Sequence, residues 1–327
     1  MKHVLRSRRR VLGSICGAAG ATLLPGLRAQ TPQWPARPIR FVVPSAAGGA
    51  ADFVGRTFGA FLQQRVQQPV VVENKPGAAA IIGAEAAKNS PPDGYTFLVS
   101  GSSTQAANVS LFKRLPYDPE KDFVEVGIFG LFPNIAVVKP DGRFRGIDDI
   151  IRQAAEKPGT VTYGYYSSSS QVPPALIQAQ AGLRMTGASY KNITQIISDV
   201  AGGVLDFAFL DALSAAPALN GLLTPIAVTS PEPFLNLPDV PPVARVLPGF
   251  EVQSWLGLSA PAGTPGPIVS RINEIMKEAS ADPSFQEAIS KKGMTVRYST
   301  PAEHSAFAAA DRKRWAEWVR IARIEPQ

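Results

Sequence analysis

The sequence predicts an α/β protein of two domains, in which mixed, mostly parallel sheets are flanked by helices. From Trp34 onward, short runs rich in β-branched and aromatic residues alternate with segments of helical periodicity, which is typical of parallel βαβ units. This alternation is longer than one compact core usually accommodates, so two domains are favoured. No segment repeats at a fixed period.

The first predicted elements lie before residue 104. A strand at Arg40–Val43 precedes a helix, because apolar residues recur at helical spacing from Phe53 to Val66. Further strands are expected at Pro69–Glu73 and Tyr95–Ser100. Between these two strands, the small residues of segment 77–90 predict a helix.

The middle and the end of the chain continue the alternation. Val124–Val138 is a long apolar stretch that Pro133 interrupts, and residues 231–243 form a proline-rich surface segment. Strands are expected at Thr160–Tyr166, Val204–Leu210, Pro225–Thr229 and Gln253–Ala260. Helices are expected at Ile147–Glu156, Ser214–Leu219 and Ala302–Ile321, and two further helices are expected to end at Ala181 and at Ser280.

We divide the chain into an export signal at residues 1–29 and two domains. Domain I takes residues 30–131 and returns at residues 253–327 with the C-terminal helix. Domain II takes residues 132–252. The chain would therefore cross twice between the domains.

The basic charge of the chain is concentrated at its N-terminus. The chain has 33 Lys and Arg against 26 Asp and Glu, but residues 1–29 contain Lys2, Arg6, Arg8, Arg9, Arg10 and Arg28 and no acidic side chain. Without these, 33 − 6 = 27 basic side chains balance 26 acidic ones. No basic stripe with interleaved aromatics remains, so we expect no nucleic-acid partner.

Residues 1–29 have the pattern of a cleaved export signal. A basic segment, 7-SRRRVLG-13, precedes a moderately apolar stretch, and 27-LRA-29 fits cleavage after Ala29. The arginines resemble a twin-arginine signal, and an ordinary Sec signal is the alternative. Because the single cysteine, Cys16, lies in this segment, the mature chain has no thiol, which suits an oxidising compartment.

Catalytic and metal-binding side chains are scarce. The mature chain keeps one histidine, His304, in a predicted amphipathic surface helix, and no serine stands in a nucleophile-elbow motif. We therefore expect no catalytic residue, no metal and no cofactor. An enzyme that uses Asp52, Asp211 or Lys191 in the same fold is the alternative.

Four predicted strands end in loops of small or hydroxylic residues, each followed by a helix. The loops are 44-PSAAGG-49, 101-GSST-104, 167-SSSSQ-171 and 211-DALS-214. In open α/β sheets, ligands bind at the carboxyl ends of strands, where helix N-termini offer unpaired N–H groups to an anion. We expect two pairs of loops to face each other across a cleft.

Each loop also has a purely structural interpretation. Gly48 and Gly49 lack the Gly-Lys-Ser/Thr of a phosphate-binding loop and can form a tight turn in which Asp52 bonds loop amides. The tract Ser167–Ser170 can be a linker, although serines before a helix also cap it and can reach an anion. The aromatic and the cation of 189-SYKN-192 can be a surface pair.

Seven segments taken together resemble a known family. They are 34-WPARPIRFVVPSAAGGAAD-52, 70-VVVENKPGAAAIIGAE-85, 92-PDGYTFLV-99, 116-PYDPEKDF-123, 201-AGGVLDFAF-209, 237-LPDVPPVA-244 and 254-SWLGLSAPAGTPGPIVSRIN-273. In this order they are similar to the tripartite tricarboxylate transporter substrate-binding proteins, also called Bug receptors. The similarity covers about residues 34–322.

The resemblance implies a periplasmic two-domain protein of the Venus-flytrap type, without enzymatic activity, that binds a small carboxylated molecule between its domains. It implies a membrane permease as partner, or alternatively a sensor protein, and we expect a monomer. The first loop would hold a carboxylate through backbone amides, and the serine-rich loop would hold the other end of the ligand. The expected ligand-binding residues are Pro44, Ser45, Ala46, Ala47, Gly48, Gly49, Asp52, Ser102, Ser103, Thr104, Ser167, Ser168, Ser169, Ser170, Gln171, Tyr190, Lys191 and Asp211.

Three segments depart from the pattern of this family. Ser45–Ala47 replaces an aromatic residue and prolines, 168-SSSQVPPAL-176 replaces a Gly-Thr-x-x-His run, and 188-ASYKNI-193 replaces Val-Pro-Tyr-Lys-Gly. These departures predict a reshaped pocket whose first-loop wall is less aromatic.

Overall fold

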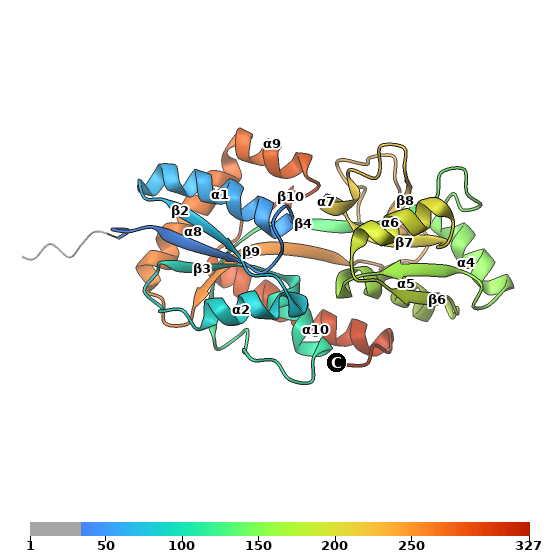
Figure 1. Ribbon diagram of the computed structural model, residues 1–327, viewed down its shortest axis with the longest axis horizontal. Helices are drawn as coiled ribbons and strands as arrows, with labels where there is room; N and C mark the ends of the chain where they lie inside the picture. The colour runs from blue at the N-terminus through green and yellow to red at the C-terminus, as the bar shows by residue number, and fades with distance from the viewer. Residues whose placement is uncertain (1–33) are drawn as a thin grey trace, which may run out of the picture. The chain divides into compact units, whose positions relative to one another are not determined.

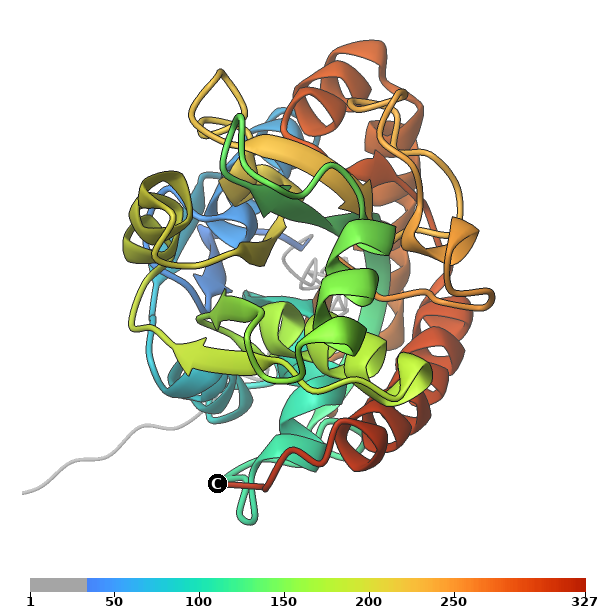
Figure 2. The same cartoon turned by 90° about the vertical axis from the view of Figure 1, so that its right-hand side faces the viewer.

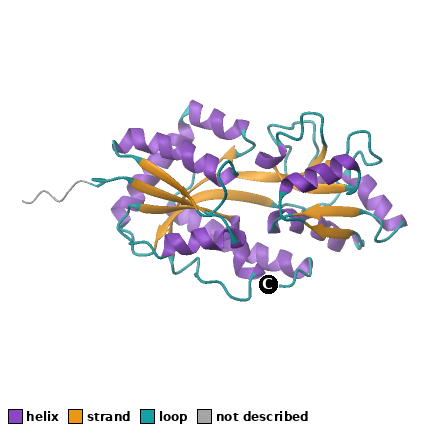
Figure 3. Cartoon of the chain, viewed as in Figure 1, coloured by secondary structure: helices purple, strands orange, loops and turns teal. Residues whose placement is uncertain are grey.

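The computed structural model describes residues 34–327, which form one compact unit. The expected export signal, with Cys16 and the cleavage site at Ala29, lies outside the described residues. Ten strands form a mixed sheet with helices on both faces, which confirms the α/β class (Figures 1 and 3). Among the helices of residues 34–327, none has the length and apolar content needed to cross a membrane.

The strand order is β2-β1-β3-β9-β4-β7-β5-β6, and β8 and β10 also pair with β4. The strands are β1 (Ile39–Val43), β2 (Val70–Asn74), β3 (Thr96–Gly101), β4 (Phe123–Val138), β5 (Thr162–Tyr165), β6 (Thr186–Ser189), β7 (Phe207–Asp211), β8 (Thr224–Val228), β9 (Gln253–Pro261) and β10 (Thr295–Val296).

Ten α-helices and three shorter turns connect the strands described here. The helices are α1 (Ala50–Val66), α2 (Ile81–Lys88), α3 (Asn108–Leu111), α4 (Ile147–Glu156), α5 (Ser168–Ala181), α6 (Ile193–Gly202), α7 (Ala212–Ala215), α8 (Gly266–Ala281), α9 (Pro283–Lys291) and α10 (Pro301–Ile321). The turns are η1 (Ala78–Ala80), the π-helical η2 (Ser103–Ala107) and η3 (Val243–Arg245).

Several predicted boundaries were wrong, and four elements have no predicted counterpart. The strand expected from Val204 begins at Phe207, because Gly203 ends α6 with φ +78° and Val204 lies exposed in the turn that follows. The helix expected over residues 77–90 begins only at Ile81. The elements without a counterpart are β6, β10, α6 and α9.

The strand directions explain why distant loops meet. Strands β1 and β3 are parallel, and the antiparallel pairs β3–β9 and β9–β4 make them run in the same direction as β4. Strand β7 is antiparallel to β4 and parallel to β5. The carboxyl ends of β1 and β3 therefore point toward those of β5 and β7, and the two sets converge beside the middle of β4.

Strand β4 crosses that middle without a break, although Pro133 was expected to interrupt it. Pro133 is paired with Gln253 at the end of the β9 ladder, and from Asn134 onward β4 pairs with β7. The residue without an N–H group thus lies where pairing changes from one partner strand to the other, so the loss of a donor is tolerated.

Alternating side chains of the strands pack against helices on each face. In β1, Ile39, Phe41 and Val43 join the core under α1 and α8, whereas Val42 packs against α2. In β7, Phe207 and Phe209 face the core formed with α4 and α5. Helix α10 packs against β4, η2 and α5 and so extends beside both halves of the sheet (Figures 1 and 2).

The turn before α2 has an unusual backbone. Gly77 has φ +124°, and Ala78, Ala79 and Ala80 follow with φ values of +46°, +51° and +75°. Three successive alanines in the left-handed region are strained, because their Cβ atoms crowd the backbone. Asn108 of α3 holds the turn by donating from Nδ2 to the carbonyl of Ala79 at 2.9 Å.

We expect glycine at this turn to stabilise the protein. Each of Ala79→Gly and Ala80→Gly should raise the free energy of unfolding by roughly 0.5–1 kcal/mol, because relief of the left-handed strain exceeds the added entropy of the unfolded chain. The control Ala86→Gly, in the right-handed helix α2, should lower it by about 1 kcal/mol. Urea unfolding measures all three, and equal losses in the three variants would contradict the strain.

Candidate functional site

The four loops expected at a ligand site meet around one cavity of about 280 Å³. It lies where the carboxyl ends of β1, β3, β5 and β7 converge, and β4 and β9 contribute to its wall. The lining residues from the four loops are Pro44, Ser45, Gly101, Ser102, Ser103, Thr104, Ser167, Ser169 and Asp211, and those from the two long strands are Phe132, Ser254, Trp255 and Leu256.

Several helices begin at this cavity. Ala50 is the first residue of α1, Ala80 precedes α2, Ser102 precedes η2, and Ser167 precedes α5. No side chain caps the N-terminus of α1 at Gly49, so its first amides are free to bind an anion. The convergence of such ends produces a positive potential from the backbone alone.

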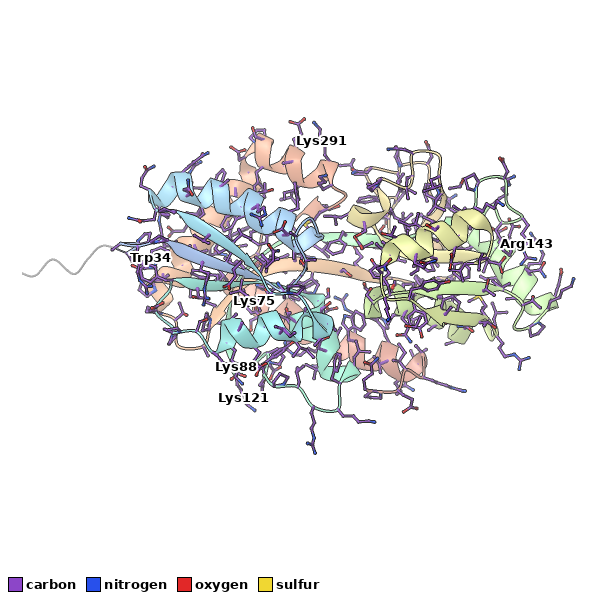
Figure 4. The ribbon with its side chains drawn as sticks, viewed as in Figure 1. Trp34, Lys75, Lys88, Lys121, Arg143 and Lys291 are labelled. Atoms are coloured by element: carbon purple, nitrogen blue, oxygen red, sulfur yellow. The ribbon has the colours of Figure 1, made fainter. Side chains whose placement is uncertain are left out.

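The described side chains that line the cavity include hydroxyls and one carboxylate, that of Asp211, but no cation. The labelled cations Lys121, Arg143 and Lys291 point outward from the ribbon (Figure 4). Hydroxyl and amide donors can bind a carboxylate when several converge on it. Ser102, for example, accepts the amide of Trp255 at 3.0 Å and keeps its own proton available.

The first loop is held in place by Asp52 of α1. Its Oδ2 accepts the Gly48 amide at 2.9 Å, and its Oδ1 accepts Asn74 Nδ2 at 2.9 Å. Burial raises the pKa of Asp52, but hydrogen bonds from Arg56, Gly48 and Asn74 outweigh it and hold the pKa below its usual range. Asp52 therefore remains ionised and binds one loop amide, that of Gly48, in the role that the structural interpretation gave it.

The carboxylate of Asp211 already has partners. Tyr166 Oη donates to its Oδ2 at 2.5 Å, and the Ser214 amide donates to its Oδ1 at 2.9 Å as the cap of α7. Burial and the Asp211 charge raise the pKa of Tyr166 well above its usual value, so the phenol keeps the proton that it donates. Asp211 therefore fixes Tyr166 in the cavity wall.

The serine tract is a helix start and not a linker. The Ser167 and Ser170 side chains form a capping box at the N-terminus of α5, and Ser170 is fully buried. Ser167 Oγ lies 3.0 Å from Ser169 Oγ, and both residues line the cavity. Ser168 belongs to α5, and its side chain lies outside the described set.

Some expected site residues lie elsewhere. Gly48, Gly49 and Asp52 line a neighbouring pocket of about 700 Å³, which shares Ala50 with the cavity. Ala46 and Ala47 are exposed and line neither space. Gln171 faces a groove beside the end of α10, Tyr190 donates from Oη to Asp199 at 2.6 Å, and Lys191 is exposed. The geometry thus does not place these residues around the cavity.

The sequence analysis missed other lining residues. Ser100 and Tyr166 each lie one position before a loop that was singled out, and Ser254 lies at the start of β9, away from those loops. Ala80 belongs to the left-handed turn before α2, which no sequence pattern predicts, since alanine rarely adopts that backbone. Phe132 and Trp255 come from the two long strands.

A larger groove, of about 650 Å³, contains cations but does not suit an anion. Lys88, Lys113 and Arg312 line it together with Asp118, Glu120 and Asp122. Lys88 is paired with Asp122 at 3.0 Å and Arg312 with Glu120 at 2.6 Å. Within residues 34–327, no group of three or more His, Asp and Glu side chains could hold a metal ion.

Comparison with known proteins identifies the family. Residues 54–323 match the sequence model of a protein family, the tripartite tricarboxylate transporter family receptor. The chain belongs to this family. It is 33% identical to protein BugT of Bordetella pertussis in an alignment of length 296, which covers 88% of this chain and 90% of BugT. Receptors of this family are periplasmic solute-binding proteins and not enzymes, which confirms the expected class.

Two solved structures show the same fold with organic acids bound. R. palustris Rpa4515 with adipate has a TM-score of 0.83 at 28% identity, and the match covers 90% of this receptor and 100% of that chain. MatC (Rpa3494) from Rhodopseudomonas palustris with bound malate has a TM-score of 0.76 at 27% identity, and the match covers 87% of this receptor and 99% of the MatC chain.

Proposed function

We propose that this receptor captures a small organic acid in the 280 Å³ cavity and presents it to a membrane permease. The observation that carries the proposal is the convergence of helix N-termini and hydroxyls on one space without a lining cation. Adipate in Rpa4515 and malate in MatC support an acid of this size. The family description supports a transporter, and not a sensor, as the partner.

The expected division into domains fits this mechanism. Residues 30–131 and 253–327 would form one lobe and residues 132–252 the other, so that β4 crosses between them and the chain returns immediately before β9. The residues around the cavity come from both lobes, so a bound acid would favour the closed arrangement only through contacts with both. We place the mature receptor in the periplasm, after cleavage near Ala29, as a monomer.

The size of the cavity favours a small ligand. Pockets for drug-sized molecules usually occupy about 300–1,000 Å³, and this cavity lies just below that range. The wall also includes Phe132, Trp255 and Leu256, which suits a short methylene chain between polar ends. We therefore expect acids of the size of malate or adipate to fit, and larger tricarboxylates to fit less well.

A thermal-shift screen tests the proposal. Adipate or malate at a hundredfold its dissociation constant should stabilise the receptor by about 2.7 kcal/mol. Adipamide and 1,6-hexanediamine are controls of the same length as adipate, without charge and with positive charge. Neither should shift the melting temperature, because only a carboxylate interacts favourably with the helix N-termini. Stabilisation by the diamine but by no acid would contradict the proposal.

A further inference from the structure

A buried carboxyl group lies under the cavity, and no loop of the site includes it. Glu125 of β4 is 8% exposed, and it is paired with Ser259 of the neighbouring strand β9. Charged side chains are rarely buried to this extent unless they have partners or a function. Among the described residues, the Ser259 hydroxyl is in direct contact with this carboxyl group, and no Lys or Arg forms an ion pair with it.

A chain of hydroxyls connects Glu125 with the cavity. Ser259 Oγ forms a short hydrogen bond with Glu125 Oε2, and it lies 2.7 Å from Ser100 Oγ. Both serines are fully buried, and Ser100 of β3 is one of the residues that line the cavity. The chain therefore crosses three adjacent strands, from β4 through β9 to β3.

Each hydroxyl has a single proton, so the hydrogen bonds that connect Glu125, Ser259 and Ser100 must all donate in the same direction. An ionised Glu125 only accepts hydrogen bonds, so Ser259 donates to it and can accept from Ser100. The proton of Ser100 then points to Ser259 and not to the cavity. A protonated Glu125 can instead donate to Ser259, which then donates to Ser100. In that arrangement the Ser100 proton is free to point toward the cavity.

Burial, and not the neighbouring groups, brings the titration of Glu125 close to neutral pH. Helix α10 contributes His304, whose Nε2 lies 3.4 Å from Glu125 Oε2, and Arg312. From η2, Gln105 Nε2 donates to Ser259 at 3.4 Å. Burial raises the pKa of Glu125 to about 7, against the lowering effects of Ser259 and Arg312, and burial lowers the pKa of His304 to about 3.

We propose that Glu125 is a positioning residue that couples ligand capture to proton uptake, because its protonated form donates to Ser259, Ser259 donates to Ser100, and Ser100 can then donate to an acid in the cavity. This rests on the proposed function. Removal of the Glu125 charge also removes a repulsion toward the ligand carboxylate, so both effects have the same sign. By linkage, an acid that binds better to the protonated receptor also raises the proton affinity of Glu125.

Calorimetric titration with adipate and malate tests the coupling. Between about pH 6 and pH 8.5, the dissociation constant of the wild type should rise by up to tenfold for each pH unit above the Glu125 pKa of about 7. Titration in two buffers with different ionisation enthalpies should show that binding takes up to about one proton from solution at the upper end of this pH range.

Three variants separate coupling from packing. Glu125→Gln keeps the shape and can donate to Ser259, so its affinity should equal that of the wild type at low pH and should not change with pH. Ser100→Ala interrupts the chain and should weaken binding at low pH and remove most of the pH dependence. Glu232→Gln, at an exposed position, should keep the wild-type profile.

The outcomes distinguish the two proposals. Binding of either acid with the same affinity and no proton uptake across the range overturns the coupling and leaves the proposed function intact. A pH dependence that persists in Glu125→Gln also overturns the coupling. Absence of heat from both acids at every pH, in a receptor that unfolds cooperatively, contradicts the proposed function and the coupling together.

Discussion

Replacement of Ser103 by tryptophan should abolish ligand binding while leaving the fold intact. Ser103 begins η2, its side chain is exposed, and it lines the cavity of about 280 Å³. A tryptophan side chain covers 150–250 Å² of surface and would fill much of this space, so roughly 100-fold or greater loss of adipate affinity is expected, equivalent to about 2.7 kcal/mol. Because the position is exposed, the unfolding midpoint should change little.

A matched variant controls for the new tryptophan. Ser284→Trp places the same side chain at an exposed position of α9, outside the residues that line the cavity. Its affinity for adipate should equal that of the wild type in isothermal titration. Wild-type affinity in both variants would show that the acid binds at another place.

The second large effect concerns the pH dependence of stability. Burial raises the pKa of Glu125 from 4.5 to about 7, and burial lowers that of His304 from 6.5 to about 3. The contribution of Glu125 to the free energy of unfolding is fully present below pH 4.5 and is lost as pH rises through about 7. The contribution of His304 to the free energy of unfolding is present above pH 6.5 and is lost as pH falls through about 3.

The two contributions oppose each other between pH 4.5 and 6.5. There the unfolded chain carries one proton on His304 and the folded protein carries one on Glu125, so the pair adds no net pH dependence. In Glu125→Gln the free energy of unfolding should therefore rise with pH across this range, by up to about 1.4 kcal/mol per unit relative to the wild type. In His304→Leu it should fall instead.

Urea unfolding at several pH values measures these slopes. Each variant is compared with the wild type at the same pH, so that all other titrating groups cancel. Any constant cost of repacking around position 125 or 304 shifts a curve without changing its slope. Parallel curves for the wild type and both variants would contradict the assigned protonation states.

The sequence was sufficient to predict the meeting of the loops, because it follows from strand ends. Small and hydroxylic residues after β1, β3, β5 and β7 indicated helix starts, and helix starts at strand ends share one edge of a sheet. Short apolar runs such as that of the predicted strand Arg40–Val43 indicated which elements are strands, and the structure has a strand at Ile39–Val43. These features depend on local order in the chain, which a sequence displays directly.

Other features depend on tertiary contacts that the sequence does not display. His304 was assigned to a surface helix, yet it is fully buried, because α10 lies over β4 and Trp255 packs edge-on against the imidazole ring at 5.0 Å. The assignment of Gly48 and Gly49 to the same pocket as Ser45 was also too coarse, since the loop turns at Ala46 and Ala47 and faces two spaces. The partners of Glu125 come from other strands and from α10.

Crystallography of the receptor with adipate tests the central claim most directly. We expect the acid in the cavity between the first-loop residues Pro44 and Ser45 and the serines Ser167 and Ser169, with one carboxylate within hydrogen-bond distance of main-chain amides or hydroxyls there. Adipate bound instead in the groove beside Lys88 and Arg312, with the cavity filled by water, would contradict the account.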